Sequence, residues 1–306
     1  MKKGRATTYF QSEEIMITNE SMKEFCENNP KLVMVKETSN PGLFVLKYRK
    51  CVFFDNLWNE HLEECRGTIV DENFDPVSVP LTKIYNDFEP KAPRIGLKTP
   101  ITAFRKVNGF MGAITFHNDE LLISTTGSID SDFVGYIKES IDYDRYMKVC
   151  KLYPDYTFIF ECVHKDDPHI IEEVPGMYLL AYRKKKWTSP VYHDPQQLLA
   201  LSYDFDCFTP ISVSTSLEYL KERIKDIRHE GFVWYEDETG VSGKIKSPYY
   251  LATKAVARKA DIMKLNKKII DEEYFPLIDH LKNIKDYFNS LDEQQRLCYI
   301  RDYYAK

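Results

Sequence analysis

Lys106-Val107-Asn108-Gly109 stands between two apolar, β-rich runs, 101–104 and 110–116. This context predicts a lysine at the end of a strand, with Gly109 allowing the backbone to turn or to approach a ligand closely. The same four residues would also suit a surface hairpin turn. The residues downstream of them decide between these two interpretations.

The composition is typical of a globular protein. The chain has 306 residues, of which 43% are hydrophobic and 29% are charged, and this length suits one large domain or two. The 21 tyrosines and 18 phenylalanines indicate a packed β core more than ring-stacking surfaces. A net charge of −5 argues against a general polybasic coat but leaves room for a local basic groove.

Three further features bear on the cellular environment. No apolar run approaches the ~20 residues that span a bilayer, so we expect no membrane association. The charged N-terminus lacks the apolar segment of a secretory signal. The seven cysteines form no Cys-x-x-Cys pair, which disfavours a disulfide framework or zinc ribbon and favours a reducing cytosol.

The predicted elements alternate between strands and helices. Strands are expected at 32–35, 43–48, 52–54, 65–70, 76–81, 101–104, 110–116, 121–125, 156–163, 177–183, 231–234 and 242–246. Helices are expected at 21–28, 132–140, 143–152, 195–201 and 216–228. From Tyr249 onward the apolar residues follow helical spacing alone. We therefore predict a domain over 1–253 and a small all-α C-terminal domain over 254–306.

Charged residues recur at the ends of the predicted strands. They are Arg66, Lys83, Lys106, Glu161, Glu230, Lys244 and Lys246. Lys244 and Lys246 share one face of a strand, because side chains alternate with a period of two. Glu161 ends an otherwise buried run, where an unpaired carboxylate would be costly.

Cations gathered in one cleft repel one another unless a polyanion lies between them, and their crowding lowers the pKa of a lysine until it can act as a nucleophile. We therefore expect that one lysine of this cluster is neutral and nucleophilic. Lysines and an arginine beside two carboxylates suit a nucleoside triphosphate with a divalent metal.

Each residue also has a purely structural interpretation. Arg66 would serve as an ion-pair partner, Lys83 as a solvated strand end and Glu230 as a turn cap. Lys244 and Lys246 would face water from an edge strand.

In this order, the residues resemble the six collinear motifs of the covalent nucleotidyltransferases, which include polynucleotide ligases and capping enzymes. The matching segments are Lys106 to Gly109 (first motif), Phe160-Glu161 (third), Leu179 to Arg183 (the next strand), Glu230 to Val233 (fourth) and Lys244 to Lys246 (fifth). Three more segments are similar to the phage RNA ligase 1 family, the tRNA-repair ligases of T-even phages. These are Glu64 to Gly67, Lys83 to Asn86 and Gly127 to Ile129. The resemblance covers about residues 60–250.

The resemblance implies an α+β fold: a nucleotidyltransferase domain, ATP-grasp-like, of antiparallel sheets flanked by helices. Residues 1–95 would form its N-terminal subregion. The implied activity is an ATP-dependent RNA ligase that joins 5′-phosphate and 3′-hydroxyl RNA ends, on single-stranded RNA or broken tRNA. ATP is the co-substrate, with Mg²⁺ or Mn²⁺, and an end-healing kinase or phosphatase is a possible partner. The location implied is the cytoplasm, or the host cytoplasm if a phage encodes the chain.

The same resemblance implies the role of each site residue. Lys106 would be the neutral nucleophile and would carry AMP, and Lys244 and Lys246 would stabilise the transition states at the α-phosphate. The nucleotide-binding set would be Arg66, Lys83, Tyr85, Gly109, Glu161, Glu230, Lys244 and Lys246. Glu161 and Glu230 would also hold the metal.

The chain departs from the family pattern at two positions. Asn108 replaces the usual Asp of the first motif, and Thr126 stands where a Lys usually precedes Gly-Ser. Two alternative functions stay open: a nick-sealing RNA ligase that acts on duplexes, and a non-catalytic protein that binds RNA ends. DNA ligases and capping enzymes normally have an OB barrel after the fifth motif, and the helical pattern after Tyr249 disfavours both.

Three other groups of polar residues give weaker functional signals. Arg183 to Trp187 suits a solvated hairpin tip better than an RNA-binding patch. His164 and His169 lack companions for a metal site, so surface or core use is favoured over zinc. A basic series fits either a solvated helix face or a stripe that follows phosphates. It comprises Lys254, Arg258, Lys259, Lys264, Lys267 and Lys268.

Overall fold

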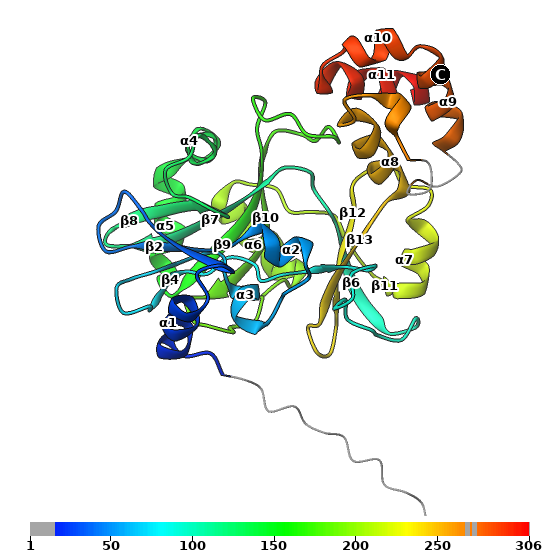
Figure 1. Cartoon of the computed structure of the whole chain (residues 1–306). Helices are drawn as coiled ribbons and strands as arrows, with labels where there is room; N and C mark the ends of the chain where they lie inside the picture. Colours follow the sequence, from blue (N-terminus) through cyan, green and yellow to red (C-terminus); the bar gives the residue numbers. More distant parts are fainter. Residues whose placement is uncertain (1–15, 267–269, 271–273, 306) are drawn as a thin grey trace, which may run out of the picture.

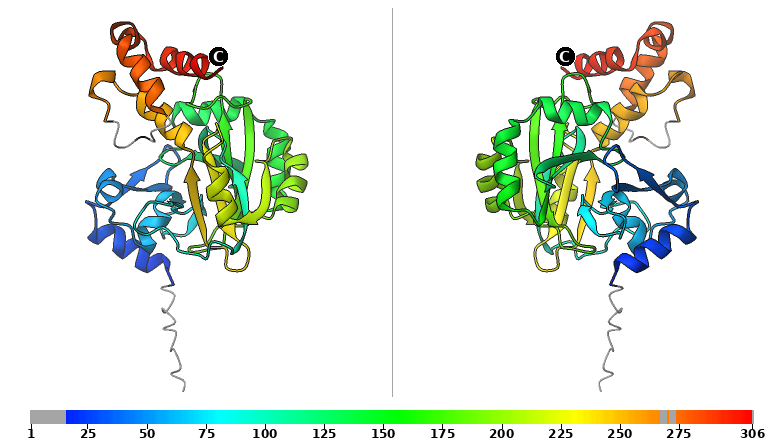
Figure 2. Two further views of the ribbon diagram at one scale, coloured as in Figure 1. Left: turned by 90° about the vertical axis from the view of Figure 1, so that its right-hand side faces the viewer. Right: turned by 90° about the vertical axis from the view of Figure 1, so that its left-hand side faces the viewer.

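The computed structural model describes residues 16–266, 270 and 274–305. Within them, three sheets with flanking helices make up most of the molecule, and the C-terminal helices lie at the end opposite α1 (Figures 1 and 2). The predicted α+β class, with antiparallel sheets flanked by helices, is confirmed. No described helix is long and apolar enough to cross a bilayer.

The N-terminal sheet has four antiparallel strands in the order β1-β2-β3-β4. They are β1 (Val33–Glu37), β2 (Phe44–Tyr48), β3 (Arg66–Val70) and β4 (Pro76–Ser78). Three short helices belong to this region: α1 (Asn19–Asn28), α2 (Lys50–Phe54) and α3 (Glu60–Glu64). The β2–β3 register places Lys47 opposite Arg66, so this sheet presents two neighbouring cations.

The second sheet has the order β10-β9-β7-β8 and is antiparallel throughout. Its strands are β7 (Phe110–His117), β8 (Glu120–Thr125), β9 (Tyr156–Val163) and β10 (Gly176–Lys184). Three helices follow its strands in the chain: α4 (Asp132–Glu139), α5 (Tyr143–Leu152) and α6 (Pro195–Phe205). Both longer helices have side-chain caps: Asp142 accepts from the Arg145 amide and Asp194 from the Gln197 amide, so each helix begins where the sequence provides a capping aspartate.

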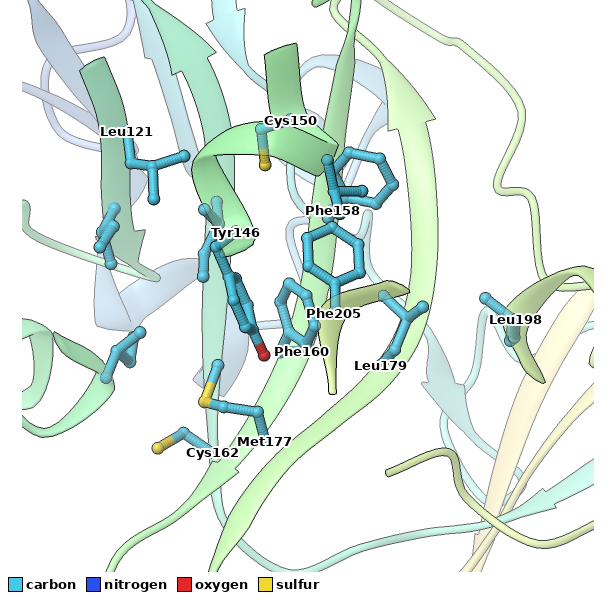
Figure 3. Close-up of a cluster of buried hydrophobic side chains, with 14 of the residues drawn as sticks. Leu121, Tyr146, Cys150, Phe158, Phe160, Cys162, Met177, Leu179, Leu198 and Phe205 are labelled. Atoms are coloured by element: carbon cyan, nitrogen blue, oxygen red, sulfur yellow. The ribbon is translucent and has the colours of Figure 1, made fainter. Parts of the chain in front are cut away.

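A large hydrophobic core lies between this sheet and its helices (Figure 3). Tyr146 from α5 and Phe205 from α6 meet with ring centroids 4.7 Å apart. Phe158 of β9 lies 4.8 Å from Phe205, and Phe160 is fully buried beside them. This packing fixes strand β9, which carries Glu161 directly after Phe160.

The third sheet has the order β11-β6-β12-β13-β5. Its strands are β5 (Tyr85–Asn86), β6 (Pro100–Arg105), β11 (Ser212–Ser216), β12 (Gly231–Glu236) and β13 (Ser242–Lys246), and α7 (Leu217–Arg223) follows β11. All pairs are antiparallel except β13 with β5. The register sets Phe232 opposite Arg105 and Gly231 opposite Lys246, so the ends of β6, β12 and β13 meet.

The described residues after β13 form helices. They are α8 (Pro248–Ala257), a 3₁₀ turn η1 (Ile262–Lys264), α9 (Phe275–Asn283), α10 (Lys285–Ser290) and α11 (Glu293–Ala305). They share one core, which also takes in Ile170 and Ile171 from the loop between β9 and β10. The predicted boundary at residue 253 falls inside α8, and the division of the chain into two domains stays a prediction.

One of the expected elements is wrong, and another is shorter than expected. Residues 52–54 form part of helix α2, in which Val52 is buried while Phe53 and Phe54 are exposed. Their β-branched and aromatic character suggested a strand, but one-sided burial over a single turn favours a helix. The helix expected at 216–228 is the shorter α7, and strand β11, which precedes it, was missed.

Candidate functional site

Lys106 lies where three strands end. Its amide donates to the carbonyl of Gly231 (2.8 Å), which ties the residue after β6 to the start of β12. Its ammonium lies 3.1 Å from Glu230 Oε2 and 3.9 Å from Glu161 Oε1. Glu230 also pairs with Lys246, with 2.9 Å between Oε1 and Nζ. The structure therefore brings Lys106, Lys246 and both predicted carboxylates together.

The charge state expected for Lys106 is wrong in this structure. Burial alone would lower the pKa of Lys106, but Glu161 and Glu230 outweigh burial and raise it above its usual value. The sequence-based argument counted the neighbouring cations and overlooked that both carboxylates would lie closer to the amine. The two carboxylates therefore favour the protonated, ion-paired form of Lys106.

The crowding effect falls on Lys244 instead. Burial and repulsion from Arg66, Lys83, Lys246 and Lys106 together lower the pKa of Lys244 to about 7. An ammonium held among cations gains from any polyanion placed between them. The charge of Lys244 is therefore sensitive to a bound anion.

A pocket of about 170 Å³ lies beside these residues. Its charged lining comes from Arg66, Arg105, Lys106, Glu161 and Lys244. Its apolar lining includes Phe104, Met111, Leu180, Val233 and Tyr235. A mostly apolar pocket with a few convergent charged groups is the usual form of a small-molecule site, and this one suits a base and sugar beside phosphates.

Arg66 faces this pocket from β3. Its guanidinium carbon lies 5.7 Å from the ring centroid of Tyr48 and 5.9 Å from that of Trp58. Its Nε atom is buried without a hydrogen-bond partner in the described part of the chain. A buried guanidinium donor of this kind is suited to an anionic ligand.

Lys83 and Tyr85, two other predicted nucleotide-binding residues, do not line this pocket. The Lys83 ammonium pairs with Glu89 and lies 4.8 Å from the ring centroid of Tyr85. The Tyr85 hydroxyl donates to Glu63. Both side chains are buried, and repulsion from Lys83 is one of the causes that lower the pKa of Lys244.

Gly109 is needed because two strands approach closely. A Cβ atom on this residue would lie 2.2 Å from the carbonyl oxygen of Cys162. The Gly109 amide also donates to Glu161 Oε1 (3.0 Å). The sequence predicted a turn or a close approach to a ligand at Gly109, whereas the close approach in this structure is made to β9, and it orients a carboxylate of the site.

Two residues that the sequence reasoning left out of the site contact it. Asn108 is buried, donates from Nδ2 to Glu230 Oε2 (2.6 Å) and accepts at Oδ1 from the Ile171 amide (2.9 Å). Lys47 lies beside Gly127, where an added Cβ would be 2.5 Å from Lys47 Nζ. Lys47 thus places a cation next to Thr126, at the step where the resemblance expects a lysine.

Arg183, His164 and His169, which the sequence also singled out, have partners within the protein. Arg183 is buried, pairs with Glu64 at 2.9 Å and donates to the carbonyls of Pro80 and Ser189, so it is a structural residue. His169 pairs with Asp167 at 2.7 Å, and His164 lies 3.3 Å from Glu139. Lys267 and Lys268 of the basic series lie outside the described residues.

The sequence matches no protein-family model and no curated protein. Several solved structures are nevertheless similar in fold. An archaeal ATP-dependent RNA ligase aligns in two forms, with TM-scores of 0.58 and 0.55 and identities of 13% and 14%. These alignments cover 92% and 90% of this chain and 78% and 74% of the ligase. A protein described as an ATP-dependent DNA ligase from Aquifex aeolicus aligns with a TM-score of 0.52 at 15% identity, over 90% of this chain and 75% of that protein.

At these identities the similarity establishes the fold: the chain has the nucleotidyltransferase fold of the ATP-dependent ligases, as predicted. RNA and DNA ligases share this fold, so the fold alone does not choose the nucleic acid. The similarity extends to structures described as RNA and DNA ligases alike, and it gives no support to the narrower resemblance to the phage RNA ligase 1 family.

Proposed function

We propose that the protein is an ATP-dependent RNA ligase that joins 5′-phosphate and 3′-hydroxyl ends. The observation that carries the proposal is the placement of Lys106 between Glu161 and Glu230, on the wall of a pocket that also presents Arg66 and Lys244. The ligase fold of the chain supports the same reaction class.

The proposed reaction has three steps. The Lys106 amine, once it has lost its proton, attacks the α-phosphorus of ATP, the bond to the β-phosphate breaks and pyrophosphate leaves. The AMP then passes from the lysine nitrogen to the 5′-phosphate of an RNA end, and a 3′-hydroxyl displaces AMP to form the phosphodiester. Lys244 and Lys246 stabilise charge on the α-phosphate oxygens, and loss of one such donor typically costs roughly 10²–10³ in rate. Arg66 binds the outgoing phosphates.

The carboxylates of the site fit a divalent cation. Mg²⁺ is usually held by one or two carboxylates together with substrate phosphates and water, and Glu161 and Glu230 converge on one point here. When bound there, the cation would offset phosphate charge and weaken the hold of both carboxylates on the Lys106 proton. We assign Glu161 and Glu230 as its ligands.

RNA is favoured over DNA as the substrate by the elements that follow β13. In the part of the chain that the structure describes, these elements are helices, whereas a DNA ligase or capping enzyme would present an OB barrel there. The finer predictions of phage origin, tRNA repair and an end-healing partner have no support from the comparisons.

The test is incubation with α-labelled ATP and Mg²⁺, followed by denaturing electrophoresis. Label is expected on the wild type and on a control variant, Lys23→Ala, which loses an exposed lysine of α1. Label is expected to be absent from Lys106→Ala. Equal labelling of Lys106→Ala and the wild type would refute the site assignment.

A substrate panel then separates the remaining alternatives. We expect the protein to seal single-stranded RNA that carries 5′-phosphate and 3′-hydroxyl ends. Sealing confined to nicked duplexes would indicate the nick-sealing activity. RNA binding without any covalent AMP would indicate a non-catalytic protein that binds RNA ends.

A further inference from the structure

One face of α8 continues the cation cluster away from the pocket. Ser247 alone separates β13 from α8; its hydroxyl caps the helix by accepting from the Tyr250 amide (3.1 Å) and donates to the His229 carbonyl (2.6 Å). The Tyr250 ring centroid then lies 4.8 Å from Lys246 Nζ and 5.5 Å from Lys254 Nζ. A single buried ring therefore holds two ammonium groups near each other.

The spacing along the helix extends this face. Tyr250, Lys254 and Arg258 are four residues apart, which places them on one side of the helix at intervals of about 6 Å. Burial, followed by repulsion from Lys246 and Arg258, lowers the pKa of Lys254. The side chains of Lys246, Lys254 and Arg258 thus form a row of interacting cations.

The cations differ in how well they are neutralised. Lys246 has Glu230 at 2.9 Å, and Arg258 has Glu293 at 2.8 Å in a largely exposed pair. Among the described residues, no carboxylate lies within ion-pair distance of Lys254. A merely solvated lysine would extend away from like charges, whereas Lys254 is half-buried against Tyr250 between two of them.

We propose that the α8 face formed by Lys254 and Arg258 binds backbone phosphates of the RNA strand next to its reacting end. The inference rests on the proposed ligase function and adds where the substrate lies. The row begins at Lys246, which shares Glu230 with Lys106, so the RNA leads away from the reactive lysine along α8. The RNA backbone carries one phosphate charge per nucleotide, and this regular series of charges matches a row of regularly spaced cations better than a folded acidic protein does.

The experiment measures the binding of a 5′-phosphorylated, fluorescent single-stranded RNA by anisotropy over a salt series, without ATP. The variant is Lys254→Gln/Arg258→Gln, which removes both charges and keeps residues that suit a helix. Each lost phosphate contact lowers the slope of log K against log salt by about 0.7 for a single strand, so a decrease of about 1.4 is expected. If the variant and the wild type bind equally at 1 M salt, this difference in slope makes the variant bind about 25-fold more weakly at 0.1 M salt.

Two controls keep the test decisive. Lys23→Gln/Lys31→Gln removes the same charge at the α1 end of the molecule and is expected to keep the wild-type slope (Figure 1). Lys254→Arg/Arg258→Lys keeps both charges and is expected to bind RNA like the wild type, which separates loss of charge from damage to the helix.

An unchanged slope in the double Gln variant, or an equal loss in the α1 control, would overturn the proposal. The proposal would also be overturned if polyglutamate displaced the labelled RNA as effectively as unlabelled RNA does. Failure of the wild type to self-adenylate would instead refute the ligase function, so the two failures are distinguishable.

Discussion

Lys106 and Lys244 lie on the wall of one pocket, yet their pKa values shift in opposite directions. Two carboxylates within 4 Å keep Lys106 charged, whereas burial and four cationic neighbours lower the pKa of Lys244 to about 7. The two lysines therefore suit different tasks. In the proposed reaction, Lys106 is an ion-paired ammonium before ATP binds, and Lys244 would gain its charge when an anion binds.

Binding of a triphosphate should therefore take up a proton at Lys244. A group with a pKa of about 7 is roughly 10% protonated at pH 8, so pairing with phosphate would take up close to one proton per ATP. Calorimetric titration with α,β-methylene-ATP in two buffers of different ionisation enthalpy measures this number. Lys244→Arg, which is always charged, is expected to take up almost none; equal uptake in the variant and the wild type would exclude Lys244 as the source.

Asn108 offers a second prediction at the scale of a residue. Asn108→Asp would place a carboxylate at the position from which Nδ2 donates to Glu230 at 2.6 Å, so one of the two acids must hold a proton. We expect self-adenylation to fall at least about tenfold at pH 8, and to recover toward lower pH. Asn108→Ala loses the hydrogen bonds without adding charge, so its pH profile should keep the wild-type shape. An Asp variant with the wild-type profile would contradict the proposed contact.

At the scale of elements, a buried ion pair fastens β10 to the N-terminal region. Arg183 and Glu64 are 1% and 4% exposed, and no other cation in the described residues lies within ion-pair distance of Glu64. Arg183→Met would leave a buried carboxylate unpaired, and the free energy of unfolding should fall by about 3–5 kcal/mol. Urea denaturation measures the loss. Lys186 lies three residues away and is exposed, so Lys186→Met should change the free energy of unfolding by less than about 0.5 kcal/mol.

The sequence predicted elements well where pattern and burial agree, and poorly where tertiary contacts decide. The alternating runs that became β7, β8 and β9 were recognisable because each buries one face or both. Strand β11 was missed because its Ser-rich segment is held by pairing with β6 and not by burial. The charge of Lys106 also depends on tertiary contacts, because its two carboxylate partners lie 55 and 124 residues away in sequence (161 − 106 and 230 − 106). It could therefore not be predicted from the sequence.

At the scale of the whole molecule, the loop between β9 and β10 connects the site to the C-terminal helices. Ile171 donates its amide to Asn108, and Glu173 pairs with Arg105 at 2.7 Å. The side chains of Ile170 and Ile171 lie in the C-terminal core, and Arg301 of α11 pairs with Glu172 at 3.2 Å. The packing of the helices therefore helps to hold Asn108, and through it Glu230.

Loosening this loop should affect both ends of the connection. Ile170→Ala removes a buried side chain and should cost about 2–4 kcal/mol of stability, seen as faster amide exchange in α9 to α11. Self-adenylation should slow as Asn108 loses its support. Val174→Ala, in the same loop but 63% exposed, is the matched control and should change neither measurement. Unaltered self-adenylation in Ile170→Ala, despite faster exchange, would show that the loop does not couple the two regions.

The one-residue junction at Ser247 has a consequence for the chemistry. Only one residue, Ser247, joins β13 to α8, and its amide donates to the Glu230 carbonyl (3.0 Å). RNA bound by α8 would therefore stay within a short, fixed distance of Lys106. Its end would meet the adenylate at an effective concentration set by this geometry and not by the RNA in solution. Joining would then be limited by how long the strand stays bound, so dilute RNA ends would still be sealed once captured.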